Sequence, residues 1–550
     1  GASGRIMVQP LMYGQPEVVT PPFGGAAAPV FSPDDCWLLY VHTFEGQDSL
    51  AIVDAAGKKW PQKLVSGDDF YMQPAWGPSG EWIAWISWNF PQMPWDGARL
   101  FLGRLVFRES EAGLALPALV ESRCLAGDEQ TAVQQPTFSP DGRHLAYLAD
   151  SSGWEQLYLY NLNSGETRQL TQAPGELGQP AWQQGRRTFV FSADGGRIYF
   201  IRNRMGTHSL WRHDLHTGTE AQLQLDPQYS SLEQICLGQT PAGERLAFMA
   251  SGDRTPKRLL TLDPHTEQVQ IRARAANEEI HPDRYVPAEH IQWEMENGEQ
   301  VYGLYYDPRR LRFTTPPGGE EKPPLILIVH GGPTGQAGRE FNAEAQFFAT
   351  RGYAVLLANY RGSTGYGRAY RNALRGNLGV HDVEDSVAGA RRLVALGEVD
   401  GSRLAIIGSS SGGATALLAL ARFPGFFKAG VVRYPVVDQL ALAEETHKFE
   451  ARYNDQLIGP LPAAASLYRE RSPLSHLQHI KDPLALFHGE DDPVVPLRQS
   501  LLVKESLARR GIPHIFHSYP GESHGFRQPE TRIHYYKEVE KFLRRFVVYP

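Results

Sequence analysis

The chain has 550 residues, of which 42% are hydrophobic and 21% charged, and its formal net charge at pH 7 is -7. This length predicts two or more domains, and the apolar content excludes a disordered chain. The acidic balance and the lack of a dense Lys/Arg run argue against a nucleic-acid-binding protein. No apolar run approaches the roughly 18 residues of a membrane span, so we expect no membrane partner.

The cysteine content gives information on the cellular compartment and does not predict a disulfide or metal site. Cys36, Cys124 and Cys236 are odd in number and far apart, which fits neither a disulfide framework nor a metal site. Free thiols favour a reducing compartment, so a cytoplasmic location is expected. Because the chain begins with Gly1 and not Met, a removed signal peptide is also compatible with the sequence.

One phrase recurs along the first half of the chain, with clear copies at Pro29–Tyr40, Pro74–Trp85 and Pro136–Tyr147. Weaker copies follow at Pro180–Trp182 together with Phe189–Phe200, and at Leu237–Phe248. Each copy combines a strand, a tight turn of the Pro-Asp-Gly type and an alternating strand, and two further short strands usually follow. Four strands per unit at intervals of roughly 45 to 60 residues predict a β-propeller over residues 1–275, with five legible blades. A β-sandwich is the alternative, but sandwiches do not repeat a phrase.

The first residues predict a sixth, partial blade at the start of the chain. Residues 4–10 and 16–20 resemble the last two strands of a unit whose first two strands are absent. Because a propeller closes to hide its strand edges, we expect one of two solutions. Either strands from the linker at 272–290 complete the blade, or upstream sequence is missing.

A loop in the second repeat, Trp85–Gly97, is rich in aromatic residues and proline. Such a composition suggests a surface that contacts a ligand, with Trp95 and Asp96 as candidate substrate-binding residues. The alternative is a loop that packs on the neighbouring domain.

Residues 276–550 alternate strands with helices and predict the mostly parallel, doubly wound sheet of an α/β-hydrolase. The apolar runs at 324–330, 353–359, 429–434, 483–487 and 514–519 are the expected strands, and 383–396, 498–510 and 531–546 the expected helices. Functional groups of such sheets lie at the carboxyl ends of the strands.

The expected nucleophile is Ser410. The run Leu404–Ile407 predicts a strand and the residues from Ala414 onward a helix, with a Gly-rich turn between them. Only Ser410 has a glycine two residues away on both sides, as the G-x-S-x-G elbow requires. A Gly/Ser-rich loop without function is the alternative.

Asp492 and His524 are the expected acid and base, with Asp491 as the rival acid. Both follow predicted strands, and the order Ser, Asp, His is that of an α/β-hydrolase. A serine hydroxyl needs a base to become a nucleophile, and a histidine can take its proton and later return it. The carboxylate fixes the imidazole tautomer. A loop histidine without function is the alternative reading of His524.

The oxyanion hole is predicted to combine two backbone N–H groups. One belongs to Ser411, directly after the nucleophile, and the other to Gly332 in the sequence His330-Gly-Gly-Pro333. The paired histidines at 213 and 216 and at 514 and 517 lack a third ligand nearby, so we expect no metal site and no cofactor.

Several phrases together resemble one protein family: His330-Gly-Gly-Pro333, Asn359–Gly367, the G-x-S-x-G-G elbow, Asp492-x-x-Val-Pro496 and Ser523-His-Gly525. With the propeller, they are similar to the prolyl oligopeptidase family, and most similar to its acylaminoacyl and dipeptidyl peptidases. The segments 93–97, 446–453 and 524–527 resemble bacterial members of the puromycin hydrolase type. The resemblance implies that Ser410, Asp492 and His524 form the triad and that the propeller admits only short peptides.

The resemblance also places Val436, Phe449 and Val495 where members line the pocket for the residue before the scissile bond; core packing is the alternative. Three departures leave the exopeptidase subtype open. Val494 stands where acylaminoacyl peptidases often carry Arg, no counterpart of the dipeptidyl peptidases' Glu pair is evident, and the family's propeller has seven or eight blades.

The sequence therefore predicts a serine peptidase that cleaves short peptides or aminoacyl amides near the N-terminus, and a homo-oligomer is compatible with it. If only free N-termini are trimmed, a carboxylate, with Asp96 as the candidate, would hold the substrate ammonium. The alternatives are an esterase with the same triad and a propeller-based binding protein with an inert hydrolase domain.

Overall fold

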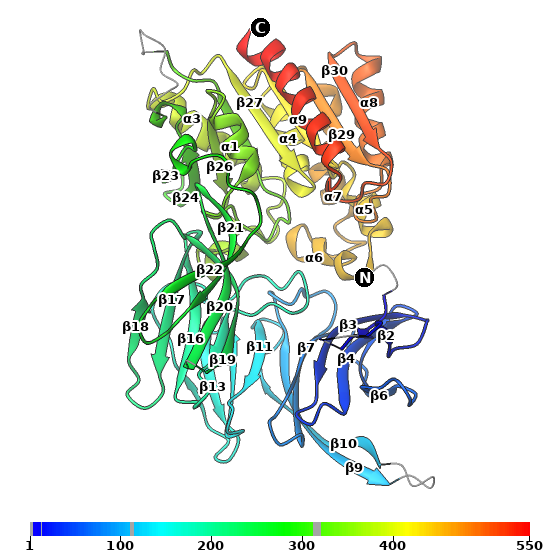
Figure 1. Cartoon of the computed structure of the whole chain (residues 1–550). Helices are drawn as coiled ribbons and strands as arrows, with labels where there is room; N and C mark the ends of the chain where they lie inside the picture. The colour runs from blue at the N-terminus through cyan, green and yellow to red at the C-terminus, as the bar shows by residue number, and fades with distance from the viewer. Residues whose placement is uncertain are drawn as a thin grey trace.

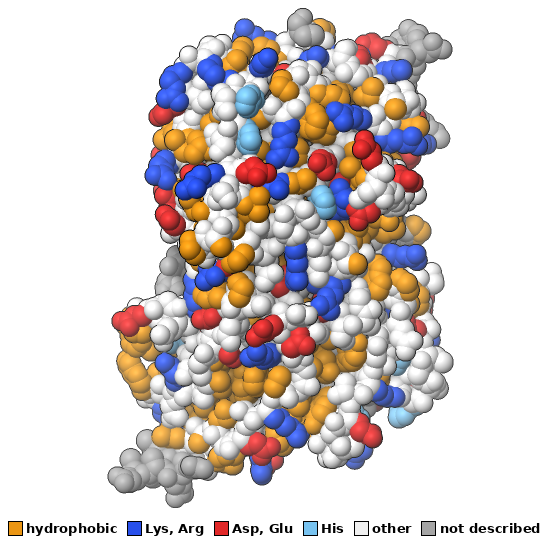
Figure 2. All heavy atoms as spheres, turned by 180° about the vertical axis from the view of Figure 1, so that it is seen from behind, with side chains coloured by type: hydrophobic (Ala, Val, Ile, Leu, Met, Phe, Trp, Pro, Cys, Tyr) orange, Lys and Arg blue, Asp and Glu red, His pale blue; other side chains and the backbone are white. Residues whose placement is uncertain are grey.

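The computed structural model describes residues 4–10, 12, 14–109, 115–241, 243–311 and 321–549. Two bodies are stacked, an all-β body from the N-terminal half and an α/β body from the C-terminal half (Figure 1). None of the described helices is long and apolar enough to cross a membrane. Charged side chains of both signs are interspersed over the face shown in Figure 2, without a broad area of one sign.

The N-terminal body contains five antiparallel sheets of four strands, each formed by consecutive strands. The first two sheets contain β3 (Gly25–Phe31), β4 (Trp37–Phe44), β5 (Gln47–Asp54) and β6 (Gln62–Val65), then β7 (Phe70–Trp76), β8 (Trp82–Trp88), β9 (Arg99–Glu109) and β10 (Ala115–Ala126). The next two contain β11 (Val133–Phe138), β12 (His144–Ala149), β13 (Gln156–Asn161) and β14 (Thr167–Gln169), then β15 (Phe189–Phe191), β16 (Arg197–Arg204), β17 (Thr207–Asp214) and β18 (Glu220–Leu223). The fifth contains β19 (Ser231–Thr240), β20 (Gly243–Gly252), β21 (Thr255–Leu262) and β22 (Val269–Arg274).

The repeated turn is built the same way in three of these sheets. In the third, Ser139 Oγ donates to Asp141 Oδ1 at 2.6 Å, and Gly142 adopts a φ of +70°, which favours glycine. Ser32 with Asp34, and Ser192 with Asp194, repeat the hydroxyl–carboxylate bond. Apolar clusters fill the spaces between successive sheets, for example Leu39 and Ile52 against Ile83 and Trp85. Sheets stacked face to face in this way confirm the predicted propeller fold class.

The two strands expected at the start of the chain are short and pair only with each other among the described strands. They are β1 (Met7–Val8) and β2 (Glu17–Val18), and their flanks Ile6 and Val19 are buried against the first sheet. The described linker residues 275–287 contain a single 3-10 turn, η1 (Pro282–Arg284), and no strand. Of the two expected solutions, the structure does not form the first: the strand residues of the 272–290 linker belong to β22 and to β23 (Ala288–Glu294), and neither strand pairs with β1 or β2.

The C-terminal body is built on one eight-stranded sheet in the order β23-β24-β26-β25-β27-β28-β29-β30. Its strands are β23 (Ala288–Glu294), β24 (Gln300–Tyr306), β25 (Leu325–Val329), β26 (Ala354–Asn359), β27 (Leu404–Ser409), β28 (Ala429–Arg433), β29 (Leu484–Gly489) and β30 (His514–Tyr519). The pairings β23–β24 and β24–β26 are antiparallel, and the remaining pairings are parallel.

Helices cover both faces of this sheet (Figure 1). One apolar core lies under α1 (Ala343–Ala349) and α9 (Pro529–Leu543), and a second lies under α3 (His381–Ala395), α4 (Ser411–Arg422) and α8 (Arg498–Arg509). The shorter helical segments are α2 (Arg368–Asn372), α5 (Gln439–Glu445), α6 (Tyr453–Leu457), α7 (Ala465–Arg471), η2 (Pro308–Arg310), η3 (Lys448–Glu450), η4 (Pro473–His479) and the π-helical η5 (Arg544–Val548). Two covered faces around a mostly parallel sheet confirm the predicted doubly wound α/β fold.

Candidate active site

Ser410 lies in a sharp turn between β27 and α4, at the carboxyl end of the sheet. Its φ of +56° is unusual for a residue with a side chain, and such strain is kept only where the surroundings fix it. The flanking glycines have no room for a Cβ. A Cβ on Gly408 would lie 2.0 Å from the carbonyl oxygen of Gly412, and one on Gly412 would lie 2.3 Å from that of Val329. The local geometry is that of a nucleophile elbow.

Asp492 and His524 meet beside this elbow. Nδ1 of His524 donates to Oδ2 of Asp492 at 2.7 Å, while Oδ1 of Asp492 accepts the backbone N–H groups of Val494 and Val495 at 2.9 Å each. The Asp492 side chain is fully buried and that of His524 is 21% exposed. The rival acid, Asp491, is exposed to solvent. The contact with His524 thus belongs to Asp492.

A second histidine, His488, supports the turn that holds Asp492. It is buried, its Nε2 donates to the carbonyl oxygen of Val495 at 2.9 Å, and its Nδ1 lies 2.7 Å from Ser500 Oγ. Burial lowers its pKa, so the ring stays neutral at neutral pH. The hydrogen bonds of His488 therefore help to fix the conformation of the turn that carries Asp492.

The glycine loop of the expected oxyanion hole runs against the elbow. A Cβ on Gly331 would lie 3.3 Å from the Cβ of Ser410, whereas Gly332 adopts a φ of +120° and turns the chain toward Pro333. Ser411, the source of the other N–H, is the first residue of α4, where the helix dipole favours negative charge. Of the two loop glycines, the structure places Gly331 against Ser410.

His330 anchors this loop as a neutral residue. Burial lowers the pKa of His330 to about 4. Its Nδ1 donates to the carbonyl oxygen of Gly331 at 2.9 Å, and its Nε2 accepts from Ser363 Oγ at 2.8 Å. The ring also stacks on Tyr360, with 4.4 Å between the centroids. The loop after β26, which carries Ser363, thereby holds the glycine loop.

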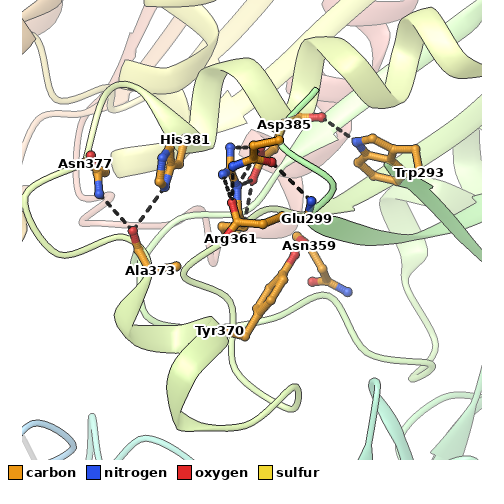
Figure 3. Close-up of polar contacts among 10 residues, drawn as sticks. Trp293, Glu299, Asn359, Arg361, Tyr370, Ala373, Asn377, His381 and Asp385 are labelled. Atoms are coloured by element: carbon orange, nitrogen blue, oxygen red, sulfur yellow. Dashed lines mark hydrogen bonds and ion pairs between the residues drawn. The ribbon is translucent and has the colours of Figure 1, made fainter. Parts of the chain in front are cut away.

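The loop after β26 is itself held by a buried ion pair (Figure 3). The guanidinium of Arg361 donates to both carboxylate oxygens of Asp385 on α3, at 2.7 to 3.1 Å, and also contacts Glu299. The Asp385 side chain is fully buried, and the Tyr370 hydroxyl donates to the carbonyl oxygen of Asn359 at 2.7 Å. Because the bidentate ion pair between Arg361 and Asp385 is shielded from solvent, it fixes the loop after β26 in one orientation relative to α3.

The residues expected to bind substrate fall into two groups. Val436 and Val495 pack together with Ala414 beside the elbow, and the N–H of Val436 donates to the carbonyl oxygen of Ser410 at 3.2 Å. Phe449 belongs to an aromatic cluster with Trp95, at 6.3 Å between ring centroids. The two valines thus lie next to Ser410.

The loop carrying Trp95 and Asp96 packs on the neighbouring domain. Trp95 is buried against Trp182 and Tyr453, with ring centroids 4.4 and 5.7 Å away. Asp96 is also buried, and its Oδ1 accepts from Nη2 of Arg375 at 2.9 Å. Because its carboxylate is paired with a guanidinium of this chain, this placement argues against Asp96 as the group that holds a substrate ammonium.

Sequence reasoning missed a pair of buried carboxylates, Glu155 and Glu176. They line a cavity of about 20 Å³ together with Trp95, Arg371 and Gly365. Oε2 of Glu176 accepts the N–H of Glu155 at 2.8 Å. Burial, reinforced by the charge of Glu176, raises the pKa of Glu155 to about 8. The one local signal is that Glu176 stands between two glycines, Gly175 and Gly178, in an otherwise irregular stretch.

This cavity lies close to the glycine loop after β25. Thr364, which also lines it, donates its N–H to the carbonyl oxygen of Gly335 at 2.8 Å. The indole N–H of Trp182 donates to the carbonyl oxygen of Thr334 at 2.7 Å. Among the described residues, no group of three or more His, Cys, Asp or Glu side chains is arranged to hold a metal ion.

The fold and the site define the class of protein, an α/β-hydrolase with an N-terminal β-propeller. Residues 339–547 match the prolyl oligopeptidase family. A solved structure of a puromycin-hydrolysing peptidase of Mycobacterium tuberculosis is 30% identical, with a TM-score of 0.89; the match covers 99% of this chain and 83% of that chain. A puromycin hydrolase mutant complexed with PGG is 31% identical, with a TM-score of 0.87, over 97% of this chain and 80% of that chain. The chain belongs to the prolyl oligopeptidase family, as the sequence motifs indicated.

Curated relatives match over a smaller share of their length. The human acylamino-acid-releasing enzyme is 25% identical over 514 residues, which cover 88% of this chain and 66% of that enzyme. Dipeptidyl aminopeptidase BIII of Pseudoxanthomonas mexicana is 32% identical over 225 residues, which cover 40% of this chain and 33% of that enzyme. The chain thus spans no more than about two thirds of the length of these relatives.

Proposed function

We propose that this protein is a serine peptidase that hydrolyses short peptides or aminoacyl amides near their N-terminus. The observation that carries the proposal is the buried Asp492 carboxylate, which holds His524 at 2.7 Å beside the strained Ser410 elbow. The known relatives named for puromycin hydrolysis and for acylamino-acid release support the same reaction class.

The chemistry follows from the positions of these groups. Ser410 Oγ attacks the scissile carbonyl as Nε2 of His524 takes its proton, and Asp492 stabilises the imidazolium. The N–H groups of Ser411 and of the glycine loop receive the oxyanion. His524 then protonates the leaving amine, and water hydrolyses the acyl-enzyme by the reverse sequence of proton transfers.

The three free cysteines, two of them exposed, support a cytoplasmic location.

The substrate's free amino group is assigned to the carboxylate pair Glu155 and Glu176. A cavity of about 20 Å³ holds one group of the size of water, which is also the size of an ammonium group. Two carboxylates at one small site repel each other unless a cation lies between them. Burial and the charge of Glu176 raise the pKa of Glu155, so a cation bound beside the two carboxylates would be favoured.

The arginines near the pair are shared with another carboxylate, Asp150. Arg371 lines the same cavity, and its Nη2 is paired with Asp150 Oδ2 at 2.9 Å. Arg368 also contacts Asp150, with 3.7 Å between Nη1 and Oδ1. Both arginines thus form ion pairs with a third carboxylate, that of Asp150. A bound ammonium would complete the charge balance of the site.

Mass spectrometry of the products from a peptide panel with free and acetylated N-termini tests the function. We expect short peptides with free N-termini to be trimmed, and acetylated copies of the same sequences to be cleaved far more slowly. The Ser410→Ala variant serves as the blank. Equal cleavage of acetylated peptides would reject the ammonium assignment while keeping the peptidase, and no cleavage of any peptide would reject the peptidase.

Replacing Glu155 by Gln should lower kcat/KM for free-amine peptides by about 100-fold, because an amide cannot balance a buried ammonium. Activity on acetylated peptides should not change. The same variant should be more stable than the wild type at pH 8. The folded pKa of about 8 lies above the ordinary value of 4.5, so folding binds a proton between these values and the wild type loses stability as pH rises through them.

Glu166→Gln, an exposed glutamate between β13 and β14 of the same sheet, is the matched control and should behave as wild type. Steady-state kinetics and thermal unfolding at pH 6 and pH 8 provide the readouts. A Glu155→Gln variant that loses stability at pH 8 and keeps its preference for free amines would show a purely structural glutamate.

A further inference from the structure

The segment Arg433–Val436 crosses the elbow and holds Ser410 through its backbone on both sides. The N–H of Ser410 donates to the carbonyl oxygen of Arg433 at 3.1 Å, and the N–H of Val436 donates to the carbonyl oxygen of Ser410 at 3.2 Å. The fit is close, since a Cβ on Gly413 would lie 2.8 Å from the Cβ of Pro435. The position of the nucleophile therefore depends on where this segment lies.

The side chain of Arg433 makes a second connection to the elbow. Arg433 and Ser409 are partners in the register of β28 and β27. Nε of Arg433 donates to Ser409 Oγ at 2.8 Å, and its Nη2 donates to Oε2 of Glu344 on α1 at 2.9 Å. One guanidinium thus ties the residue directly before the nucleophile to a helix that covers the sheet.

Glu344 is itself held in place. The hydroxyl of Tyr535 on α9 donates to Oε1 of Glu344 at 2.9 Å, and the ring centroid of Tyr535 lies 5.1 Å from the guanidinium carbon of Arg433. The side chains of Arg433 and Glu344 are 19% and 12% exposed, so water competes little for these bonds. The planar fork of an arginine in such surroundings has one favourable orientation.

The next residue connects the same segment to the base. Tyr434 has a φ of +36°, an uncommon value for a residue with a side chain, and its N–H donates to the carbonyl oxygen of Phe487 at 2.8 Å. This conformation places its ring centroid 4.5 Å from that of His524. The segment therefore contacts both partners of the proton transfer.

We propose that Arg433 is a positioning residue for the nucleophile. Through Ser409, and anchored by Glu344 and Tyr535, it holds the strained elbow so that Ser410 Oγ stays within reach of His524. Arg433 acts through its neighbours and touches no reacting atom. The proposal rests on the proposed role of Ser410 as nucleophile.

The test is Arg433→Lys, which keeps a positive charge opposite Glu344 but lacks the Nε donor to Ser409. We expect kcat on a free-amine peptide to fall by about 10- to 100-fold, because small displacements of a reacting atom have effects of this size. KM should stay within about twofold, and the thermal midpoint should hardly move. Arg403→Lys is the matched control, because Arg403 directly precedes β27 at its opposite end and pairs with Asp400.

The rate of inactivation by a fluorophosphonate separates this proposal from the assignment of the nucleophile. If the wild type does not react, the proposed function itself fails. If the wild type reacts, and Arg433→Lys reacts and turns over at the same rates, the positioning role is overturned. Should Arg433→Lys not fold, Ser409→Ala removes only the acceptor and should give the same fall in kcat. A lower thermal midpoint with unchanged kcat would leave Arg433 a structural residue only.

Discussion

Replacing Asp492 by Asn should lower kcat by about 10⁴-fold, whereas Asp491→Asn should keep it within about twofold. Oδ1 of Asp492 accepts two backbone N–H groups, so an asparagine must place its carbonyl oxygen there. Its NH₂ group then faces Nδ1 of His524. The imidazole must accept at Nδ1 and carry its proton on Nε2, and in this tautomer it cannot take the proton of Ser410.

Steady-state kinetics of both variants on one free-amine peptide, with circular dichroism as a check on folding, measures the effect. Asp491 is the fitting control because it is adjacent, chemically identical and exposed. Equal losses in the two variants, or a loss only in Asp491→Asn, would move the acid to the other aspartate.

The elbow and the repeats could be predicted because local spacing determines them. A serine between two glycines two residues away, with a strand before it and a helix after it, leaves one sharp turn available, and the structure has that turn at Ser410. The Ser-x-Asp turns of the propeller are equally local. Each hydroxyl bonds a carboxylate two residues further on, as in Ser139 and Asp141.

Groups that come together only by domain packing could not be predicted. Asp96 looked available because its partner, Arg375, is 279 residues away in the chain. Glu155 and Glu176 are 21 residues apart in irregular stretches, and no periodic pattern marks them as neighbours. Their surroundings include Arg371 and Gly365 of the other domain, which the sequence does not place next to the propeller.

The fourth copy of the repeat was expected at 180–182 together with 189–200, and the structure forms strands only in the second of these two parts. Residues 180–182 resemble the first strand of a blade, but the structure forms no strand there, and the fourth sheet begins with β15 at Phe189. Trp182 serves the interface between the domains instead, where its indole bonds Thr334. A contact between domains thus overrides a local preference for a strand.

Ser410→Ala should abolish turnover, with a loss of at least about 10⁴-fold, and should abolish labelling by a fluorophosphonate. Alanine keeps the Cβ, so the backbone strain at a φ of +56° stays and the free energy of unfolding should hardly change. Ser402→Ala, in the exposed turn before β27, is the control and should retain activity. Turnover by Ser410→Ala at the wild-type rate would exclude Ser410 as the nucleophile.

Ser410→Gly separates the chemical role of this residue from its conformational cost. Glycine adopts a positive φ without a steric penalty, so this variant should be as inactive as Ser410→Ala yet more stable by roughly 1 kcal/mol. Chemical denaturation of the two variants side by side measures the difference. An inactive variant that is more stable than the wild type is the expected result where a strained conformation is kept for catalysis, and a Ser410→Gly variant less stable than Ser410→Ala would show that the turn carries no strain.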